Sequence, residues 1–140
     1  MARKRSTLII KNYVNSILIN EKILKIVQSD IPNWQAIMMM WSHKELDVLS
    51  AKDSPFDNPH TKNFYLENIA SLVALRYASL EFNKLLDGLE TTINIFGSYF
   101  LCTTDIDNKI FSIIFPRNEQ ITEATELFQK TANQIRDSIP

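Results

Sequence analysis

Residues 90 to 116 read ETTINIFGSYFLCTTDIDNKIFSIIFP, and this stretch decides the fold. Three segments rich in β-branched and aromatic residues (90–96, 99–104 and 109–115) are separated by two short polar turns. Because short turns join antiparallel neighbours, the stretch predicts a three-stranded meander. Pro116 lacks a backbone N–H and ends the last strand.

A helix is predicted directly after this meander. Asn118 is the expected N-cap, and Glu119 favours the first turn. Apolar residues then recur at helical spacing as far as the end of the chain. The stripe consists of Ile121, Ala124, Phe128, Ala132, Ile135 and Ile139.

Two more strands are expected in the first half of the chain. Residues 35–41 form a continuous apolar run, typical of a strand buried on both faces, and 46–51 would close a hairpin with it. Residues 7–29 carry a helical stripe, as one long helix or two short ones, which ends before Pro32. Prolines and acidic residues make 52–63 a loop.

The segment between the two groups of strands predicts a helix with two apolar stripes. Over residues 66–86 one stripe carries Leu66, Ile69, Val73, Tyr77 and Leu80. The other lies nearly opposite. A helix lying on its own sheet needs one stripe, so the second must meet another element of this chain or a second subunit. That second stripe consists of Leu72, Leu75, Phe82 and Leu86, with Ser79 among them.

The element order therefore predicts an α/β chain of the α+β sandwich type. It is α-β-β-α-β-β-β-α, with one five-stranded antiparallel sheet and helices on both faces. Residues 1–6 are expected to form a flexible basic tail, and 7–140 a single domain. The 140 residues are 45% hydrophobic, enough for a sizeable core.

The charge balance and the cysteine count exclude several classes of protein. With 15 Lys and Arg against 16 Asp and Glu, the chain has no strong positive potential that would attract nucleic acid. We therefore do not expect nucleic acid as a partner. No apolar stretch is long enough to span a bilayer, and we expect no integral membrane contact. A single cysteine, Cys102, allows no internal disulfide, and the cytoplasm is the expected compartment.

The sequence contains no recognisable catalytic, cofactor-binding or metal-binding motif. Two glycines cannot supply a phosphate-binding loop. Asp53, Asp57 and His60 could meet at a metal, but solvated loop residues explain them as well. Cys102 lies in a predicted strand, where a thiol is usually a small buried hydrophobe with a raised pKa. We therefore predict a protein without cofactors or metals that is not an enzyme.

Two stretches of this chain resemble the roadblock/LC7 family. The first is the strand pair over 35–51, followed by the helix that begins LENIASLVALRYA at residue 66. The second is TINIFGSYFLC at residues 92–102, then KIFSIIF at 109–115 and the closing helix. The resemblance covers most of the chain and consists of hydrophobic patterns.

The resemblance implies a dimer, either a homodimer or a heterodimer with another roadblock chain. In such dimers the third strands of two subunits pair antiparallel, and the second helices pack together. Such proteins serve as platforms for Ras-like small GTPases or for motor and signalling complexes. On this sequence the implied interface consists of Leu72, Leu75, Ser79 and Phe82 on the helix and Thr91, Ile93 and Ile95 on the strand.

A second interpretation is a ligand-sensing module of profilin-like, longin-like or PAS-like form. An antiparallel sheet flanked by helices can enclose a pocket, here lined by Trp34, Met39 and Phe100. An enzyme ranks third, because active sites dispersed along a sequence leave no local motif.

Overall fold

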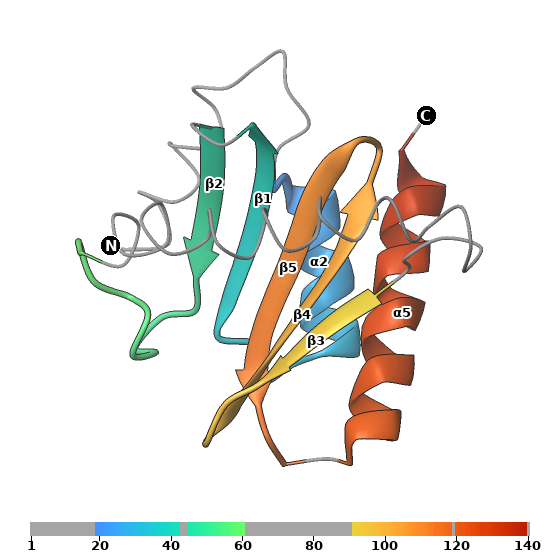
Figure 1. Ribbon diagram of the computed structural model, residues 1–140. Coiled ribbons are helices and arrows are strands. Elements are labelled where there is room, and N and C mark those ends of the chain that lie inside the picture. The colour runs from blue at the N-terminus through green and yellow to red at the C-terminus, as the bar shows by residue number, and fades with distance from the viewer. Residues whose placement is uncertain (1–18, 43–44, 61–90, 119, 140) are drawn as a thin grey trace.

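The computed structural model describes residues 19–42, 45–60, 91–118 and 120–139. Its five strands form one antiparallel sheet in the order β2-β1-β5-β4-β3, which confirms the predicted fold class (Figure 1). The predicted basic tail, 1–6, lies outside the described residues. The strands are β1 Ala36–Ser42, β2 Glu45–Ser50, β3 Thr91–Ile95, β4 Tyr99–Ile106 and β5 Lys109–Pro116.

The turn between β4 and β5 is tighter than the sequence suggested. Asp105 and Ile106 were expected in the turn, but β4 continues through both. Only Asp107 and Asn108 connect the strands, with φ angles of 50° and 62°. Left-handed backbone at both central residues suits a two-residue hairpin, and Asp and Asn tolerate it better than most residues do.

Helix α2 spans Glu21–Asp30 and so begins within the predicted stripe of residues 7–29. Asn20 is its N-cap, and its Oδ1 accepts a hydrogen bond from the backbone N–H of Ile23 at 2.9 Å. The helix ends two residues before Pro32, as predicted. A helix therefore starts at Glu21, while residues 7–18 lie outside the described residues.

Helix α5 spans Ile121–Ser138, and its beginning differs from the prediction. Asn118 is not the cap. Gln120 holds that position without a side-chain hydrogen bond. The backbone N–H of Arg117 donates to the carbonyl of Ser98 at 3.0 Å, so the ladder continues one residue beyond β5 before the chain enters the helix.

The two described helices lie side by side on one face of the sheet, where they enclose the larger hydrophobic cluster (Figure 1). Four of the predicted stripe residues of α5 are fully buried there: Ala124, Phe128, Ala132 and Ile135. Ile121, the first residue of that stripe, is instead 46% exposed. Phe128 stacks on Phe111 of β5, with ring centroids 6.2 Å apart.

The opposite face of the sheet carries a second, smaller cluster. Met39 belongs to the first cluster and Met38 and Met40 to the second, so β1 is buried on both faces as predicted. Phe56, from the loop after β2, packs on the second cluster and meets Tyr99 of β4 edge to face. The predicted helix 66–86, with Leu72, Leu75, Ser79 and Phe82, lies outside the described residues. The second cluster consists of Ala36, Met38, Met40, Leu46, Leu101 and Ile114.

Neither described helix is both long enough and apolar enough to cross a membrane.

Candidate docking edge at strand β3

Strand β3 is one of the two outer strands of the sheet, and its backbone orientation follows from one hydrogen bond. The N–H of Phe96 donates to the carbonyl of Tyr99, its direct opposite, at 2.9 Å. In an antiparallel pair such hydrogen-bonded positions alternate with non-bonded ones. Thr92 and Asn94 therefore bond to β4, whereas the N–H and C=O groups of Thr91, Ile93 and Ile95 point away from the sheet.

The side chains of Thr91, Ile93 and Ile95 face α5. Ile93 lies opposite Cys102 and packs against the larger hydrophobic cluster. Thr91 accepts a hydrogen bond from Gln129 of α5 at 3.3 Å. Thr91, Ile93 and Ile95 share one face of β3. However, α5 already contacts that side of β3, so these residues offer a partner chiefly their backbone.

The other face of β3 carries Thr92 and Asn94. Asn94 lies opposite Leu101, which belongs to the second cluster. Its side-chain Oδ1 is buried and accepts no hydrogen bond from any described residue. Most buried polar atoms in proteins have a partner, so a buried acceptor to which no described residue donates is unusual. The sequence analysis did not single out Asn94, because its burial comes from residues distant in sequence.

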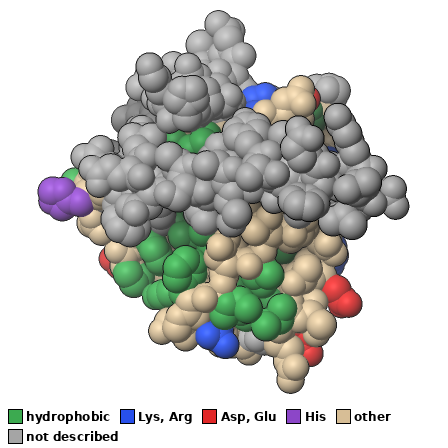
Figure 2. Space-filling view, in the orientation of Figure 1, with side chains coloured by type: hydrophobic (Ala, Val, Ile, Leu, Met, Phe, Trp, Pro, Cys, Tyr) green, Lys and Arg blue, Asp and Glu red, His purple; other side chains and the backbone are tan. Residues whose placement is uncertain are grey.

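One end of β3 continues into an exposed apolar surface. Ile95 and Phe96 are 46% and 54% exposed, and Ile121 at the start of α5 is also exposed. Figure 2 shows hydrophobic side chains exposed in the lower half of the view. Arg117 lies over the Phe100 ring at 5.7 Å and donates to the carbonyl of Phe96 at 2.8 Å.

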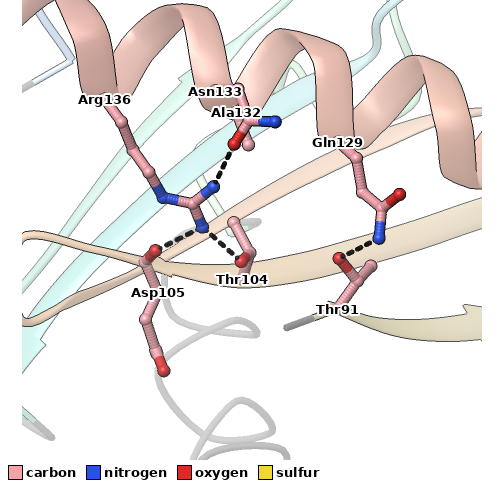
Figure 3. A pocket seen from close by; sticks show the side chains of 7 residues that line it. All are labelled: Thr91, Thr104, Asp105, Gln129, Ala132, Asn133 and Arg136. Carbon is pink, nitrogen blue, oxygen red and sulfur yellow. Dashed lines mark hydrogen bonds between the residues drawn. The ribbon is translucent and has the colours of Figure 1, made fainter. Parts of the chain in front are cut away.

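At the other end of β3 the C-terminal half of α5 is held to the sheet by polar contacts around a pocket of about 320 Å³ (Figure 3). The guanidinium of Arg136 donates to Thr104 Oγ1, at 2.8 Å, and to the carbonyl of Asp105, at 2.7 Å. It also donates to Asn133 Oδ1 on its own helix, at 2.7 Å. Together with the Gln129–Thr91 bond, these contacts hold α5 against the end of β4 and the beginning of β3.

The other candidates from the sequence lie in the core or in loops. Burial raises the pKa of Cys102 to about 12, so the thiol is protonated at neutral pH, as predicted. Trp34, Met39 and Phe100, the proposed ligand pocket, are all buried within the larger cluster.

The loop after β2 was the other candidate, as a metal site. Asp57 accepts a hydrogen bond from the backbone N–H of Asp53, at 3.4 Å, and His60 is exposed. Within the part of the chain that the structure describes, no three His, Cys, Asp or Glu side chains gather at a metal-binding distance.

No family model and no curated protein matches this sequence, but solved structures match its fold. Gliding protein MglB from Thermus thermophilus superposes with a TM-score of 0.61 at 12% identity, over 87% of this chain and 94% of that one. A Roadblock/LC7 domain from Streptomyces avermitilis gives a TM-score of 0.57 at 13% identity, over 84% and 95%. The chain has a roadblock/LC7-like fold.

A third neighbour supports the same assignment. MglB from Myxococcus xanthus superposes with a TM-score of 0.59 at 12% identity, over 84% of this chain and 94% of that one. The roadblock/LC7-like fold thus extends over most of the chain and of each neighbour. At this level of identity the likeness is one of fold.

Proposed function

We propose that this chain is a non-catalytic, cytoplasmic scaffold or regulator that dimerises through the free edge of β3. Its partner subunit is a second copy or another chain with a roadblock/LC7-like fold. The dimer binds a Ras-like small GTPase or anchors a larger signalling or motor complex. The GTPase part of the proposal comes from the resemblance to the roadblock/LC7 family.

The observation that carries the proposal is the outward orientation of the Thr91, Ile93 and Ile95 backbone. Unpaired N–H and C=O groups in a row form a template for another strand. Proteins usually protect such an edge with lysine, proline or an inward-pointing charge. β3 reads TTINI and has none of these. Exposed Ile95 and Phe96 add apolar surface at the end of the strand, which suits a partner.

The interface on the helix rests on sequence alone. Leu72, Leu75, Ser79 and Phe82 lie on the second stripe of residues 66–86, the one not needed to cover the sheet. We propose that this stripe packs against its counterpart in the dimer, beside the paired β3 strands.

The state of Cys102 supports a non-catalytic protein. It is the only cysteine in the sequence, it is fully buried, and its raised pKa keeps the thiol protonated near neutral pH. Because the thiolate is the reactive form, burial makes Cys102 a poor nucleophile.

Sedimentation velocity combined with amide hydrogen exchange tests the pairing. We expect a dimer at micromolar concentration, with the amides of Ile93 and Ile95 becoming protected as the dimer forms. The N–H of Val48 points outward on β2 in the same way and is expected to stay unprotected, which makes it the internal control. A monomer at every concentration, or a dimer in which Ile93 still exchanges rapidly, would overturn the proposal.

Affinity capture followed by mass spectrometry tests the GTPase part. The full chain is the bait, and Leu75→Asp, which places a charge on the second stripe, is the control bait. We expect a Ras-like GTPase to be enriched on the first and lost from the second. If both baits recover the same GTPase in equal amounts, GTPase binding does not depend on the dimer, and that part of the proposal is wrong.

A further inference from the structure

An open hollow of about 780 Å³ lies at the start of α5, beside the end of the sheet where β3 turns into β4. Phe100 of β4, Arg117 from the segment between β5 and α5, and Ile121 of α5 all line it. The hollow therefore combines a cation with apolar side chains. The other described residues that line it are Asn118, Gln120, Thr122 and Glu123.

The guanidinium of Arg117 is held in one orientation at this hollow. It lies over the ring of buried Phe100, with Cζ 5.7 Å from the ring centroid, and its Nη1 donates to the carbonyl of Phe96 at 2.8 Å. A guanidinium has five N–H donors, and this bond uses one of them, so four remain. A side chain that is already fixed in place loses little conformational entropy when it binds a partner.

Arg117 has no partner of opposite charge among the described residues. Glu123 lines the same hollow, but no ion pair joins Arg117 to it or to any other described residue. A free guanidinium can bind a carboxylate through two parallel hydrogen bonds. No other described residue of the lining is a lysine or an arginine, and Glu123 would repel a multiply charged anion. The charge therefore suits a single carboxylate better than a phosphate or an anionic membrane, which attracts clusters of cations.

Exposed apolar side chains gather near this cation. Ile95, Phe96 and Ile121 are the large hydrophobic residues that the described part of the chain exposes. Ile121 lines the hollow, and Ile95 lies directly opposite Phe100 in the β3–β4 pair. The carbonyl of Phe96 is the one that Arg117 bonds. A partner on this surface would bury apolar groups around one charged contact, which is how arginine and aromatic anchors contribute most to protein interfaces.

We propose that this hollow binds a segment of another protein that presents a carboxylate beside a large apolar side chain. The carboxylate accepts two hydrogen bonds from Arg117, and the apolar side chain packs on Ile121. This inference goes beyond the dimer and the GTPase proposed above. It depends on neither, because Arg117 and Ile121 lie outside β3.

Selection from a displayed library of random short peptides, with the full chain immobilised, tests the chemistry of the partner. We expect the enriched peptides to share an acidic residue next to an aromatic or large aliphatic one. Arg117→Glu reverses the charge at the hollow and should enrich basic peptides instead. Wild-type enrichment of peptides without an acidic residue, or no enrichment at all, would overturn the proposal.

Fluorescence anisotropy tests the contact itself, with one selected peptide and a counterpart in which glutamine replaces its glutamate. Arg117→Gln and the glutamine peptide should each raise the dissociation constant about tenfold. Combined, they should have no larger effect than either alone, because both remove the same charged pair. Fully additive effects would place the carboxylate elsewhere and would overturn the proposal. Lys130→Gln is the matched control, since it removes one positive charge from an exposed position of α5 away from the hollow.

Ile121→Ala tests the apolar half of the site. It should raise the dissociation constant of the selected peptide about fivefold, because it removes part of the buried apolar surface. An unchanged constant would overturn this half of the proposal. Arg117 and Ile121 are both exposed, so we expect their variants to keep the wild-type circular dichroism and thermal unfolding. The peptide should bind whether or not the chain dimerises, so this proposal and the edge pairing fail separately.

Discussion

The two outer strands of the sheet are protected very differently. β2 reads ELDVLS and carries two acidic residues, one of which, Asp47, points into the protein and is buried. Its last residue, Ser50, donates a hydrogen bond to the carbonyl of Phe56 at 2.9 Å, so the following loop is fastened to it. β3 reads TTINI and has no charge and no proline.

This difference supports the proposal that a partner binds at β3 and not at β2. An inward-pointing charge and a fastened loop are common means of preventing another strand from pairing with an edge. On β3, in contrast, the backbone groups of Thr91, Ile93 and Ile95 point outward beside exposed apolar side chains. Among the described residues, the sheet therefore has one protected edge and one edge without such protection, which is why we propose that pairing occurs at β3.

Proline substitution on the two edges is expected to give the largest contrast. Ile93→Pro removes an outward N–H at the centre of β3 and should weaken the dimer on the order of a hundredfold, because the pair at the axis is lost. Val48→Pro makes the same change on β2 and should leave the dimer intact. Sedimentation equilibrium measures both dissociation constants.

The two variants are well matched, since both replace a half-buried β-branched residue whose N–H points away from the sheet. Circular dichroism shows whether each variant retains the fold. Equal dimerisation of the two proline variants would contradict the contrast between the edges.

Two phenylalanines allow a second comparison, with smaller effects. Phe56 is half-buried and meets Tyr99 edge to face, so Phe56→Ala should lower the free energy of unfolding by about 2 kcal/mol. Phe96→Ala, at an exposed phenylalanine beside β3, should cost less than about 1 kcal/mol. Urea denaturation at one fixed protein concentration measures both. The reverse order would show that the loop after β2 contributes little to stability.

The pH dependence of stability reports on the interior next to β3, because Cys102 lies opposite Ile93. The pKa of its thiol is near 9 in the unfolded chain and about 12 in the folded one. Between these values the unfolded chain loses the proton and the folded chain keeps it. Stability should therefore fall by about 1.4 kcal/mol per pH unit above pH 9. Urea denaturation of the wild type and of Cys102→Val measures this slope, which the variant should lack.

Much of the fold could be predicted from local sequence patterns. The strands and the end of α2 lie within about two residues of their predicted positions, because periodicity, turn residues and Pro32 act over short distances. The predicted N-cap Asn118 was wrong: the ladder continues to Arg117, which bonds to Ser98, and the helix begins at Ile121 with Gln120 as its N-cap. Nothing local to Asn118 signals that bond.

The candidate site was predictable in part. The resemblance to the roadblock/LC7 family pointed to the strand that contains Thr91, Ile93 and Ile95, and that strand lies at an edge of the sheet. Because side chains alternate along a strand, these three lie on one face. The sequence could not show that α5 contacts this side of β3, or that their backbone groups are the ones exposed.

The positions of the strands and of the two described helices, and the burial of the Cys102 thiol, could be predicted from the sequence. Each depends on neighbouring residues and on the spacing of hydrophobic residues along the chain. Two features become visible only in the folded chain: which backbone groups of β3 face outward, and that Asn94 Oδ1 is buried with no donor among the described residues. Both depend on β4, because the register with Tyr99 and Leu101 determines which residues bond inward. An open edge is a property of the whole sheet, so it becomes visible only when the other strands are in place.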